Sequence, residues 1–106
     1  MVPEITAPQL AEKLNGPNPP LLIDVREPHE YEYCHIVGAQ LKPLGEIMTW
    51  VKELNPEAEI ICHCHTGVRS MQAARYLERL GFKNVHNLKG GIDAWSVLVD
   101  SSVLRY

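Results

Sequence analysis

The chain has 106 residues, of which 45% are hydrophobic and 22% charged, and its formal net charge is −3. This length allows one domain with a real hydrophobic core but not two. The slightly acidic charge argues against the basic surfaces that bind nucleic acids or anionic membranes. The apolar runs are too short to cross a bilayer, and the first residues lack the charged and apolar regions of a signal peptide. We therefore expect a single domain over residues 1–106, in the cytoplasm, with neither nucleic acid nor a membrane as a partner.

The first ordered elements are a short helix and a buried strand. A capping-box pattern with proline near the first turn, followed by apolar residues at helical spacing, predicts a helix over residues 6–15. The proline-rich segment 16–20 separates it from the apolar run 21–25, which only Asp24 interrupts. Such a run is typical of a strand buried on both faces of a parallel sheet. The carboxyl end of this strand then carries Asp24 and Arg26.

The middle of the chain contains weaker and stronger patterns. Residues 28–33 suggest a helical turn and residues 38–41 a brief strand. Apolar residues at helical intervals predict a helix with one buried face over residues 46–54, which Asn55-Pro56 ends. The apolar run 59–63 predicts another buried strand.

The last third of the chain repeats the alternation of helix and strand. A stripe of alanine and leucine predicts a helix over residues 70–80, with Gly81 at its C-terminal cap. Residues 84–88 are a strand candidate, and Gly90-Gly91 turns the chain into a short helix that contains Trp95. Strands that alternate with helices predict an α/β domain. We expect an open, mainly parallel sheet of about five strands with helices on both faces.

The segment 64–69, with the sequence CHTGVR, carries the clearest signs of chemistry. It follows a predicted strand, and ligands bind beyond the carboxyl ends of parallel strands. A loop that closes onto a helix start directs free backbone N–H groups and partial positive charge to its centre. Gly67 allows the tight turn, and Arg69 offers a donor fork suited to a sulfonate or phosphate. This environment, with any protonated histidine beside it, favours the thiolate of Cys64.

The three cysteines receive different interpretations. They cannot all pair within one chain, and a cytosolic setting keeps thiols reduced. Cys62 fits a buried core residue, whereas Cys64 at a strand end fits a nucleophile. Cys34 is interpreted as a buried or exposed cysteine, with a role as resolving thiol left open. Residues 62–65 do not predict a metal site, because neighbouring strand residues point to opposite faces and structural zinc uses two separated ligand pairs.

Four motifs stand in a fixed order along the chain: Asp24-Val25-Arg26-Glu27, His35-Ile36-Val37-Gly38-Ala39, Cys64-x-x-Gly67-x-Arg69-Ser70, and Leu88-Lys89-Gly90-Gly91-Ile92 with Trp95 after it. Together they resemble the rhodaneses, the sulfurtransferase homology domain, over nearly the whole chain. The chain departs from the family pattern at Cys34, where glycine is frequent, and at Val37, where proline is frequent. The resemblance therefore does not define the loop geometry from Cys34 to Gly38.

The resemblance implies a rhodanese-like fold and a sulfurtransferase that needs no metal or cofactor. Cys64 would take a sulfane sulfur from thiosulfate or a similar small-molecule donor and hold it as a persulfide. Cyanide or a thiol, including a protein thiol, would then accept the sulfur. Substrate binding would fall to the loop residues His65, Thr66, Gly67, Val68, Arg69 and Ser70. Asp24 and Arg26 would support the loop, and His35 would be structural, because an activated thiolate needs no general base.

Two other functions remain open for the same scaffold. One is a persulfide carrier or sulfur-binding module with little turnover of thiosulfate. The other is a phosphatase or arsenate reductase. Four residues separate Cys64 from Arg69, which resembles the Cys-x4-Arg loop of sulfurtransferases rather than the Cys-x5-Arg loop of the related cell-cycle phosphatases. A tighter ring of N–H groups suits a single sulfur atom better than a tetrahedral phosphate.

Overall fold

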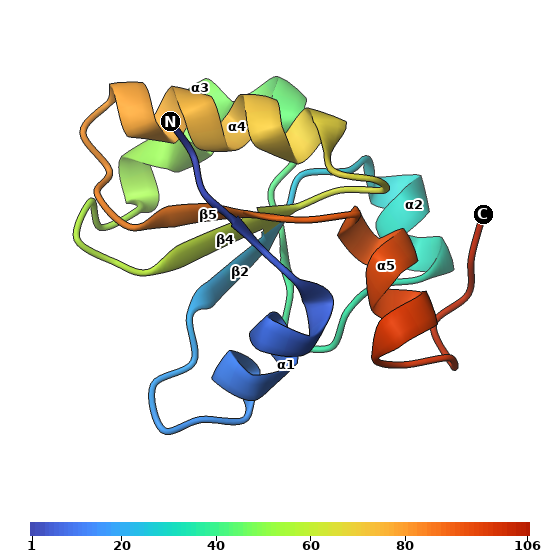
Figure 1. The fold of residues 1–106 in the computed structure, drawn as a ribbon. Coiled ribbons are helices and arrows are strands. Elements are labelled where there is room, and N and C mark those ends of the chain that lie inside the picture. The colour runs from blue at the N-terminus through green and yellow to red at the C-terminus, as the bar shows by residue number, and fades with distance from the viewer.

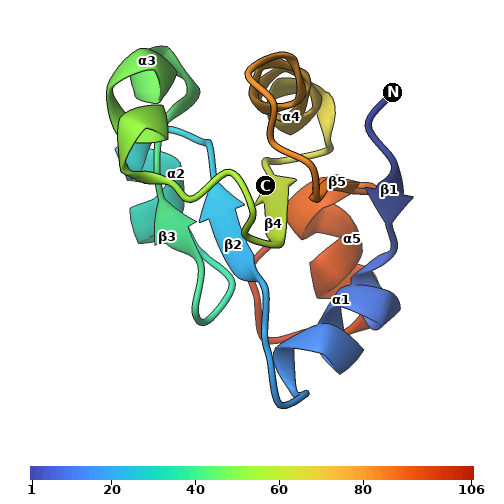
Figure 2. The same cartoon turned by 90° about the vertical axis from the view of Figure 1, so that its left-hand side faces the viewer.

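All strands of the protein belong to one parallel sheet. The computed structural model describes residues 1–106. The sheet has five strands in the order β1-β5-β4-β2-β3, and every neighbouring pair is parallel. Their bounds are Glu4–Ile5 (β1), Leu21–Asp24 (β2), Gln40–Leu41 (β3), Ile60–His63 (β4) and Val85–Leu88 (β5). Figure 2 shows this row of strands running across the picture, with helices above and below it.

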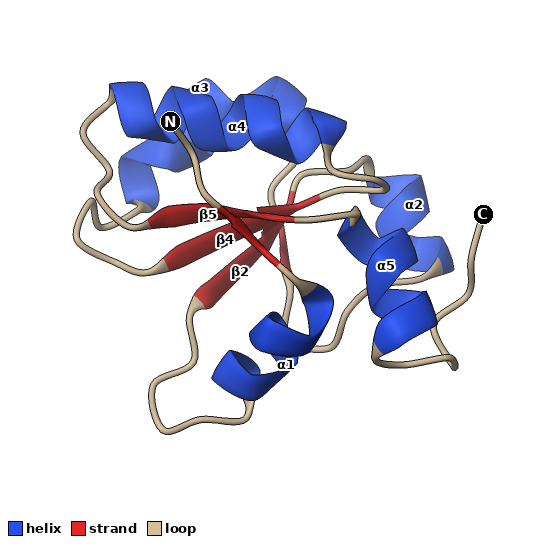
Figure 3. Ribbon diagram, in the orientation of Figure 1, coloured by secondary structure: helices blue, strands red, loops and turns tan.

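Helices cover both faces of the sheet. They are Ala7–Leu14 (α1), Pro28–Tyr33 (α2), Ile47–Trp50 (α3), Val68–Arg79 (α4) and Gly91–Leu98 (α5). The helices α3 and α4 lie on one face, and α1 and α5 lie on the other (Figures 1 and 3). The predicted open parallel α/β sheet with helices on both faces is confirmed. None of the helices is long and apolar enough to span a membrane.

The central strands are buried on both sides, so that alternate residues enter two separate cores. Ile23 and Cys62 pack with the residues of α4, whereas Leu22 and Ile61 pack with those of α1 and α5. All four side chains are at most 1% exposed. The prediction that Cys62 is a core residue is confirmed, and burial raises the pKa of its thiol to about 12.

Local sequence signals place several helix ends correctly. The hydroxyl of Thr6 accepts from the Gln9 amide, and the Gln9 side chain accepts from the Thr6 amide, so the capping box is formed. Gly81 follows the end of α4 with φ +96°, the left-handed conformation expected of a glycine cap.

The predicted helix over residues 46–54 is wrong as one continuous element. The segment consists of 3-10 turns at Leu44–Glu46 and Val51–Glu53 on either side of the four-residue α3. The Trp50 indole nitrogen donates to the Pro43 carbonyl at 2.8 Å, which ties the middle of the segment back to its beginning. The short helical turns therefore allow the Trp50 ring to be buried while its indole N–H group keeps a hydrogen-bond acceptor.

Two further boundaries differ from the prediction. The sequence does not predict the strand β1, because two residues show no periodic pattern. This strand is bonded to β5 by the amides of Asn87 and Lys89, which donate to the carbonyls of Pro3 and Ile5. The helix α4 begins at Val68, two residues earlier than predicted. The helix start therefore lies inside the CHTGVR loop, which brings its free N–H groups closer to Cys64.

Candidate active site

Cys64 lies directly after β4, in a tight loop that leads into α4. The helix cap is Gly67, whose φ of +112° lies in the left-handed region that other residues rarely adopt. Cys64 itself is 1% exposed, and none of the surface cavities is lined by it. The loop therefore holds the thiol below the surface, at the carboxyl edge of the sheet where the sequence predicts it.

Two backbone amides point at the sulfur of Cys64. The Gly67 N–H group donates to Sγ at 3.1 Å and the Ser70 N–H group at 3.4 Å. The first group belongs to the cap of α4 and the second to its first turn, where amides have no partner inside the helix. They stabilise a negative charge on the sulfur, together with the helix dipole. Of the loop amides predicted to face the thiol, these two do so.

The Ser70 hydroxyl is oriented by a residue that sequence analysis did not identify. Its oxygen lies 2.5 Å from Asn87 Oδ1 and 3.3 Å from Cys64 Sγ. The Asn87 amide nitrogen donates to the Gly67 carbonyl and to Glu4, which leaves Oδ1 as the acceptor. The single hydroxyl proton of Ser70 can therefore be donated either to Asn87 Oδ1 or to Cys64 Sγ, and the shorter distance favours Asn87. The signal that could have found this residue is that Asn87 is a polar residue within the predicted strand 84–88.

The carbonyl groups of the loop face the start of α5. The Ile92 amide donates to the Cys64 carbonyl at 2.9 Å, and the Asp93 amide donates to the His65 carbonyl at 3.1 Å. With the carbonyls held there, the loop amides are free to face the sulfur. A side chain at Gly91 would overlap both carbonyl oxygens. The Gly90-Gly91 pair thus does more than turn the chain, because Gly91 lets α5 approach the loop backbone.

The Gly91→Ala variant should therefore disturb the loop. We expect the rate at which iodoacetamide modifies Cys64 to fall about tenfold, the loss expected when one charge-stabilising hydrogen bond is removed. Modification would be followed by mass spectrometry of the peptide that contains Cys64. Gly45→Ala is the matched control, because a Cβ at Gly45 meets no atom within 4 Å. Equal rates in the two variants would show that Gly91 is not needed to shape the loop.

The permanent cation of the loop, Arg69, is ion-paired. Its guanidinium donates to both carboxylate oxygens of Glu30 in α2, at 2.6 and 2.9 Å. This hydrogen bonding is the main reason why the pKa of the Glu30 carboxyl is far below its usual range. The Arg69 side chain is still 35% exposed, whereas that of Glu30 is 12% exposed. An anion that uses Arg69 must share its guanidinium with Glu30 or displace the carboxylate.

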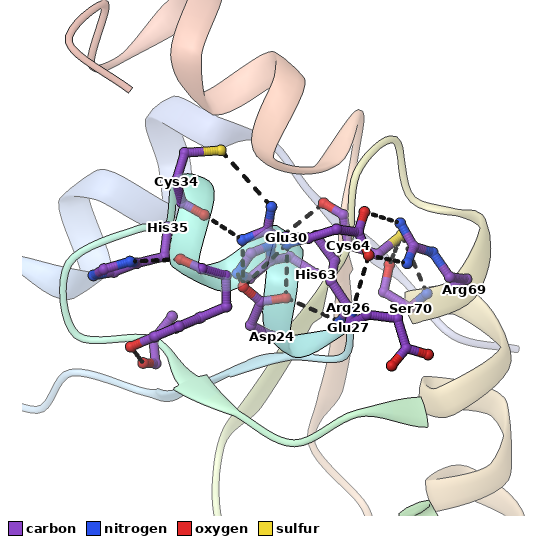
Figure 4. A network of polar contacts seen from close by, with 12 residues as sticks. Asp24, Arg26, Glu27, Glu30, Cys34, His35, His63, Cys64, Arg69 and Ser70 are labelled. Carbon is purple, nitrogen blue, oxygen red and sulfur yellow. Dashed lines mark hydrogen bonds and ion pairs between the residues drawn. The ribbon is translucent and has the colours of Figure 1, made fainter. Parts of the chain in front are cut away.

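Asp24 and Arg26 form a buried ion pair at the end of β2. Both side chains are 0% exposed, and Arg26 Nη2 donates to Asp24 Oδ2 at 2.7 Å. Arg26 also donates to the Cys34 carbonyl at 2.7 Å. Burial alone would lower the pKa of Arg26, but the hydrogen bonds with Asp24 and Tyr106 outweigh it and raise the pKa. Figure 4 shows that the pair lies between the Cys34 segment and the loop of Cys64.

The pair makes no direct hydrogen bond to the loop. It reaches Arg69 through two side chains: Arg26 Nη1 donates to the Tyr106 hydroxyl at 2.9 Å, and this hydroxyl donates to Glu30 Oε2 at 2.7 Å. Glu30 and Tyr106 were not identified from the sequence. No local pattern points to either of them, because Glu30 is 39 positions from Arg69 and Tyr106 is 80 positions from Arg26.

The remaining loop residues make no hydrogen bond to the thiol. The His65 ring stacks on the ring of Tyr106, with 4.0 Å between centroids. Thr66 and Val68 line a surface cavity of about 390 Å³ beside α4. His63, just before Cys64, is fully buried, and burial lowers the pKa of its imidazole although Asp24 opposes this shift.

The segment of the unusual Cys34 and Val37 has a defined structure. Cys34 is 8% exposed and its sulfur lies 3.8 Å from Arg26 Nη1; all three cysteines are free thiols. His35 stacks on Tyr31 and its Nδ1 lies 3.0 Å from the Tyr31 carbonyl, which fits the structural role expected of it. No group of three or more His, Cys, Asp or Glu side chains is placed to hold a metal ion.

Comparisons with known proteins agree on one family. A family model described as a rhodanese-like domain matches residues 6–98. The crystal structure of a rhodanese-like domain protein from Staphylococcus aureus has a TM-score of 0.85 and 30% identity, covering 99% of both chains. A protein named sulfurtransferase from Allochromatium vinosum is 35% identical over 91% of this chain and 90% of its own.

Other relatives carry more specific names. The putative sulfur carrier protein YrkF of Bacillus subtilis is 40% identical over 90% of this chain and 51% of its own. The thiosulfate sulfurtransferase GlpE of Pseudoalteromonas translucida is 32% identical over 80% of this chain and 81% of its own. Three curated relatives at 40% identity are longer, and the chain spans only 38%, 51% and 59% of their lengths.

Proposed function

The chain belongs to the rhodanese-like family, and from this premise we propose that it transfers sulfur as a persulfide on Cys64. The observation that carries the proposal is the pair of amide donors, from Gly67 and Ser70, directed at the Cys64 sulfur. Relatives named sulfurtransferase and sulfur carrier support sulfur transfer in general.

The proposed reaction has two displacement steps. The Cys64 thiolate attacks the outer sulfur of thiosulfate, the S–S bond of thiosulfate breaks, and sulfite leaves with the bonding electrons. The product is a Cys64 persulfide anion. In the second step cyanide or a thiolate attacks the terminal sulfur, and the Cys64 thiolate leaves, which regenerates the enzyme. No proton transfer is needed while the thiolate is stable, so the lack of a histidine bonded to Sγ is consistent with this route.

The loop has the donors that such an intermediate requires. The thiolate and the persulfide are both anions, and preorganised N–H groups stabilise both without reorganisation. The Ser70 hydroxyl can also turn toward the sulfur when the persulfide forms, because it lies within reach of both Asn87 Oδ1 and Cys64 Sγ. The thiol starts at 1% exposure. Donor binding therefore has to include a small movement of the loop or of the side chains around it.

Thiosulfate is the proposed donor, and one relative is named for it. Arg69 would hold the sulfonate of this donor, as its planar donor fork allows. Sharing with Glu30 weakens this role without removing it, because a guanidinium has five N–H donors and Glu30 uses two. The donor site is thus built around a partly neutralised arginine.

The Arg69→Ala variant should raise the KM for thiosulfate about tenfold, because it removes the sulfonate partner and leaves the Glu30 charge unpaired. The thiol should stay competent, so that iodoacetamide still modifies Cys64. Steady-state kinetics with cyanide as acceptor would measure the change. Arg79→Ala on the exposed end of the same helix is the control. A KM that stays at the wild-type value would show that the donor does not contact Arg69.

Incubation with thiosulfate followed by intact-mass measurement tests the proposed function. We expect a species heavier by one sulfur atom, located on Cys64 by peptide mapping. Addition of cyanide, glutathione or a protein thiol should return the original mass and identify the acceptor. The proposal fails if thiosulfate leaves the mass unchanged under conditions in which Cys64 reacts with iodoacetamide.

A persulfide carrier is the second candidate, and the relative named as a putative sulfur carrier favours it. A carrier would accept sulfur from a protein partner but turn over thiosulfate slowly, so turnover rather than loading distinguishes the two. Hydrolysis of para-nitrophenyl phosphate would instead indicate the phosphatase alternative. The cytoplasmic location, the single domain over residues 1–106 and the identity of donor and acceptor stay predictions.

A further inference from the structure

Residues 99–106 form a strap that leaves α5 and ends beside the active-site loop. Three contacts fasten it: the Ser96 hydroxyl donates to the Val103 carbonyl at 2.6 Å, Arg105 pairs with Asp93 at 2.9 Å, and Val103 packs against the core under α5. The strap is therefore held along its length, and it presents Tyr106 to the loop.

Tyr106 contacts groups on several elements of the site. Its ring stacks on His65 with planes 9° apart and meets the edge of Tyr33 at 6.0 Å. Its hydroxyl accepts from Arg26 and donates to Glu30. The hydroxyl thus has a fixed direction, because the charged donor on one side leaves its own proton for the carboxylate on the other.

The contact with Tyr106 completes the restraint on Glu30. Oxygen Oε1 accepts from Arg69 and from the Glu27 amide, and Oε2 accepts from Arg69 and Tyr106. The carboxylate is thereby fixed in the position in which it neutralises Arg69. Arg26 and Arg105 are likewise paired, with Asp24 and Asp93. The three arginines around Tyr106 are thus each neutralised by a carboxylate, which weakens their attraction for a compact anion.

We infer that Tyr106 is a positioning residue that sets donor specificity, because its hydroxyl keeps Glu30 on Arg69 and so weakens the binding of compact anions. The inference rests on the proposed function for the identity of the donor. Thiosulfate, a small dianion, has to compete with Glu30 for Arg69. A thiol or persulfide carried by a larger molecule, with no second anionic group beside the reacting sulfur, meets no such competition. The strap therefore favours carried sulfur over free thiosulfate.

Alkylation of Cys64 by two reagents tests this inference without requiring sulfur transfer. Iodoacetate and iodoacetamide react with the same thiolate, but the first is an anion and the second is neutral. Both rates depend equally on the fraction of Cys64 that is ionised, so this fraction drops out of their ratio at one pH. The ratio therefore measures how well the site accepts an anionic reagent compared with a neutral one. Peptide mapping separates Cys64 from Cys34, and fragmentation of the peptide that holds both Cys62 and Cys64 assigns the label to one of these two. We expect Tyr106→Phe to raise the iodoacetate-to-iodoacetamide ratio about threefold or more, the effect of weakening one hydrogen bond to a charged group.

Matched variants make the result specific. Tyr33→Phe should leave the ratio unchanged, because the Tyr33 hydroxyl makes no hydrogen bond while its ring lies beside that of Tyr106. Tyr106→Leu, which also removes the ring, should raise the ratio at least as much as Tyr106→Phe. Glu30→Gln should raise it further. A ratio in Tyr106→Phe and Tyr106→Leu equal to or below that of the wild type would overturn the inference.

Kinetics with thiosulfate give a second readout that a purely structural role would not produce. The KM for thiosulfate should fall about threefold or more in Tyr106→Phe, while kcat stays at the wild-type value. A KM that rises instead would overturn the inference. If the wild-type chain does not use thiosulfate at all, the proposed donor is wrong, but the alkylation ratio still decides whether Tyr106 controls the charge of the site.

Discussion

The Cys64→Ser variant should form no species heavier by one sulfur atom and should lose at least about 10³-fold of the turnover with thiosulfate and cyanide. Serine is nearly the same size and can accept the same two amide hydrogen bonds. Its hydroxyl, however, is not ionised at neutral pH and is a poor nucleophile without a base. No histidine is bonded to the Cys64 sulfur that could serve as one. The variant should keep the fold and lose the chemistry.

Cys34→Ser is the control for this prediction. Cys34 is buried near Arg26 and makes no hydrogen bond to Cys64, so the control should load sulfur as the wild type does. Intact mass and peptide mapping after thiosulfate treatment would measure both variants. Sulfur retained in Cys64→Ser and mapped to Cys34 would move the nucleophile to the second thiol. Slower release of sulfur in Cys34→Ser would instead give this cysteine the role of resolving thiol that the sequence left open.

The Asp24→Asn variant should lose about 3–5 kcal/mol of the free energy of unfolding, the cost of leaving a buried charge without its partner. Asp24 accepts three hydrogen bonds from the Arg26 side chain and one from its amide, and both side chains are 0% exposed. An asparagine keeps the shape but turns an N–H group toward the guanidinium. For a chain of this size such a loss is a large part of the total stability.

Urea unfolding would measure this loss, with an unchanged m value as the sign that only stability has changed. Glu57→Gln is the control, because Glu57 forms an ion pair with Lys83 in which both side chains are at least 69% exposed. Its unfolding midpoint should stay close to that of the wild type, since exposed ion pairs contribute little. A small effect in Asp24→Asn would mean that the two other acceptors of Arg26, the Cys34 carbonyl and the Tyr106 hydroxyl, are enough to stabilise the buried guanidinium.

The ion pair of β2 and the loop of β4 belong to one polar network. Arg26, Tyr106, Glu30 and Arg69 connect Asp24 in the core to the first turn of α4. Figure 4 labels the members of this network other than Tyr106. A change at Asp24 should therefore also reach the anion preference of the site, because it removes the carboxylate that holds Arg26, and Arg26 orients Tyr106. The iodoacetate-to-iodoacetamide ratio measured in Asp24→Asn would show this coupling directly.

The sequence by itself determined the features that depend on neighbours along the chain. The Thr6–Gln9 capping box joins residues three positions apart, and the left-handed turn at Gly67 belongs to a single residue. The apolar runs 21–25 and 59–63 predicted buried strands because burial on both faces leaves no polar alternation to observe. Cys64 could be located from such local facts, since a strand end, a glycine and a helix start stand next to it.

Only the tertiary structure decided which distant groups surround that thiol. Glu30 and Arg69 are 39 positions apart, Ser70 and Asn87 are 17 apart, and Arg26 and Tyr106 are 80 apart. The first two contacts follow from the sheet order, in which the carboxyl ends of β2, β4 and β5 meet at one edge, and the third from the course of the strap after α5. A pattern of apolar residues predicts that strands exist but not which strand lies beside which. The charge of the site is consequently a property of the fold, because it depends on Arg69 having Glu30, held by Tyr106, as its partner.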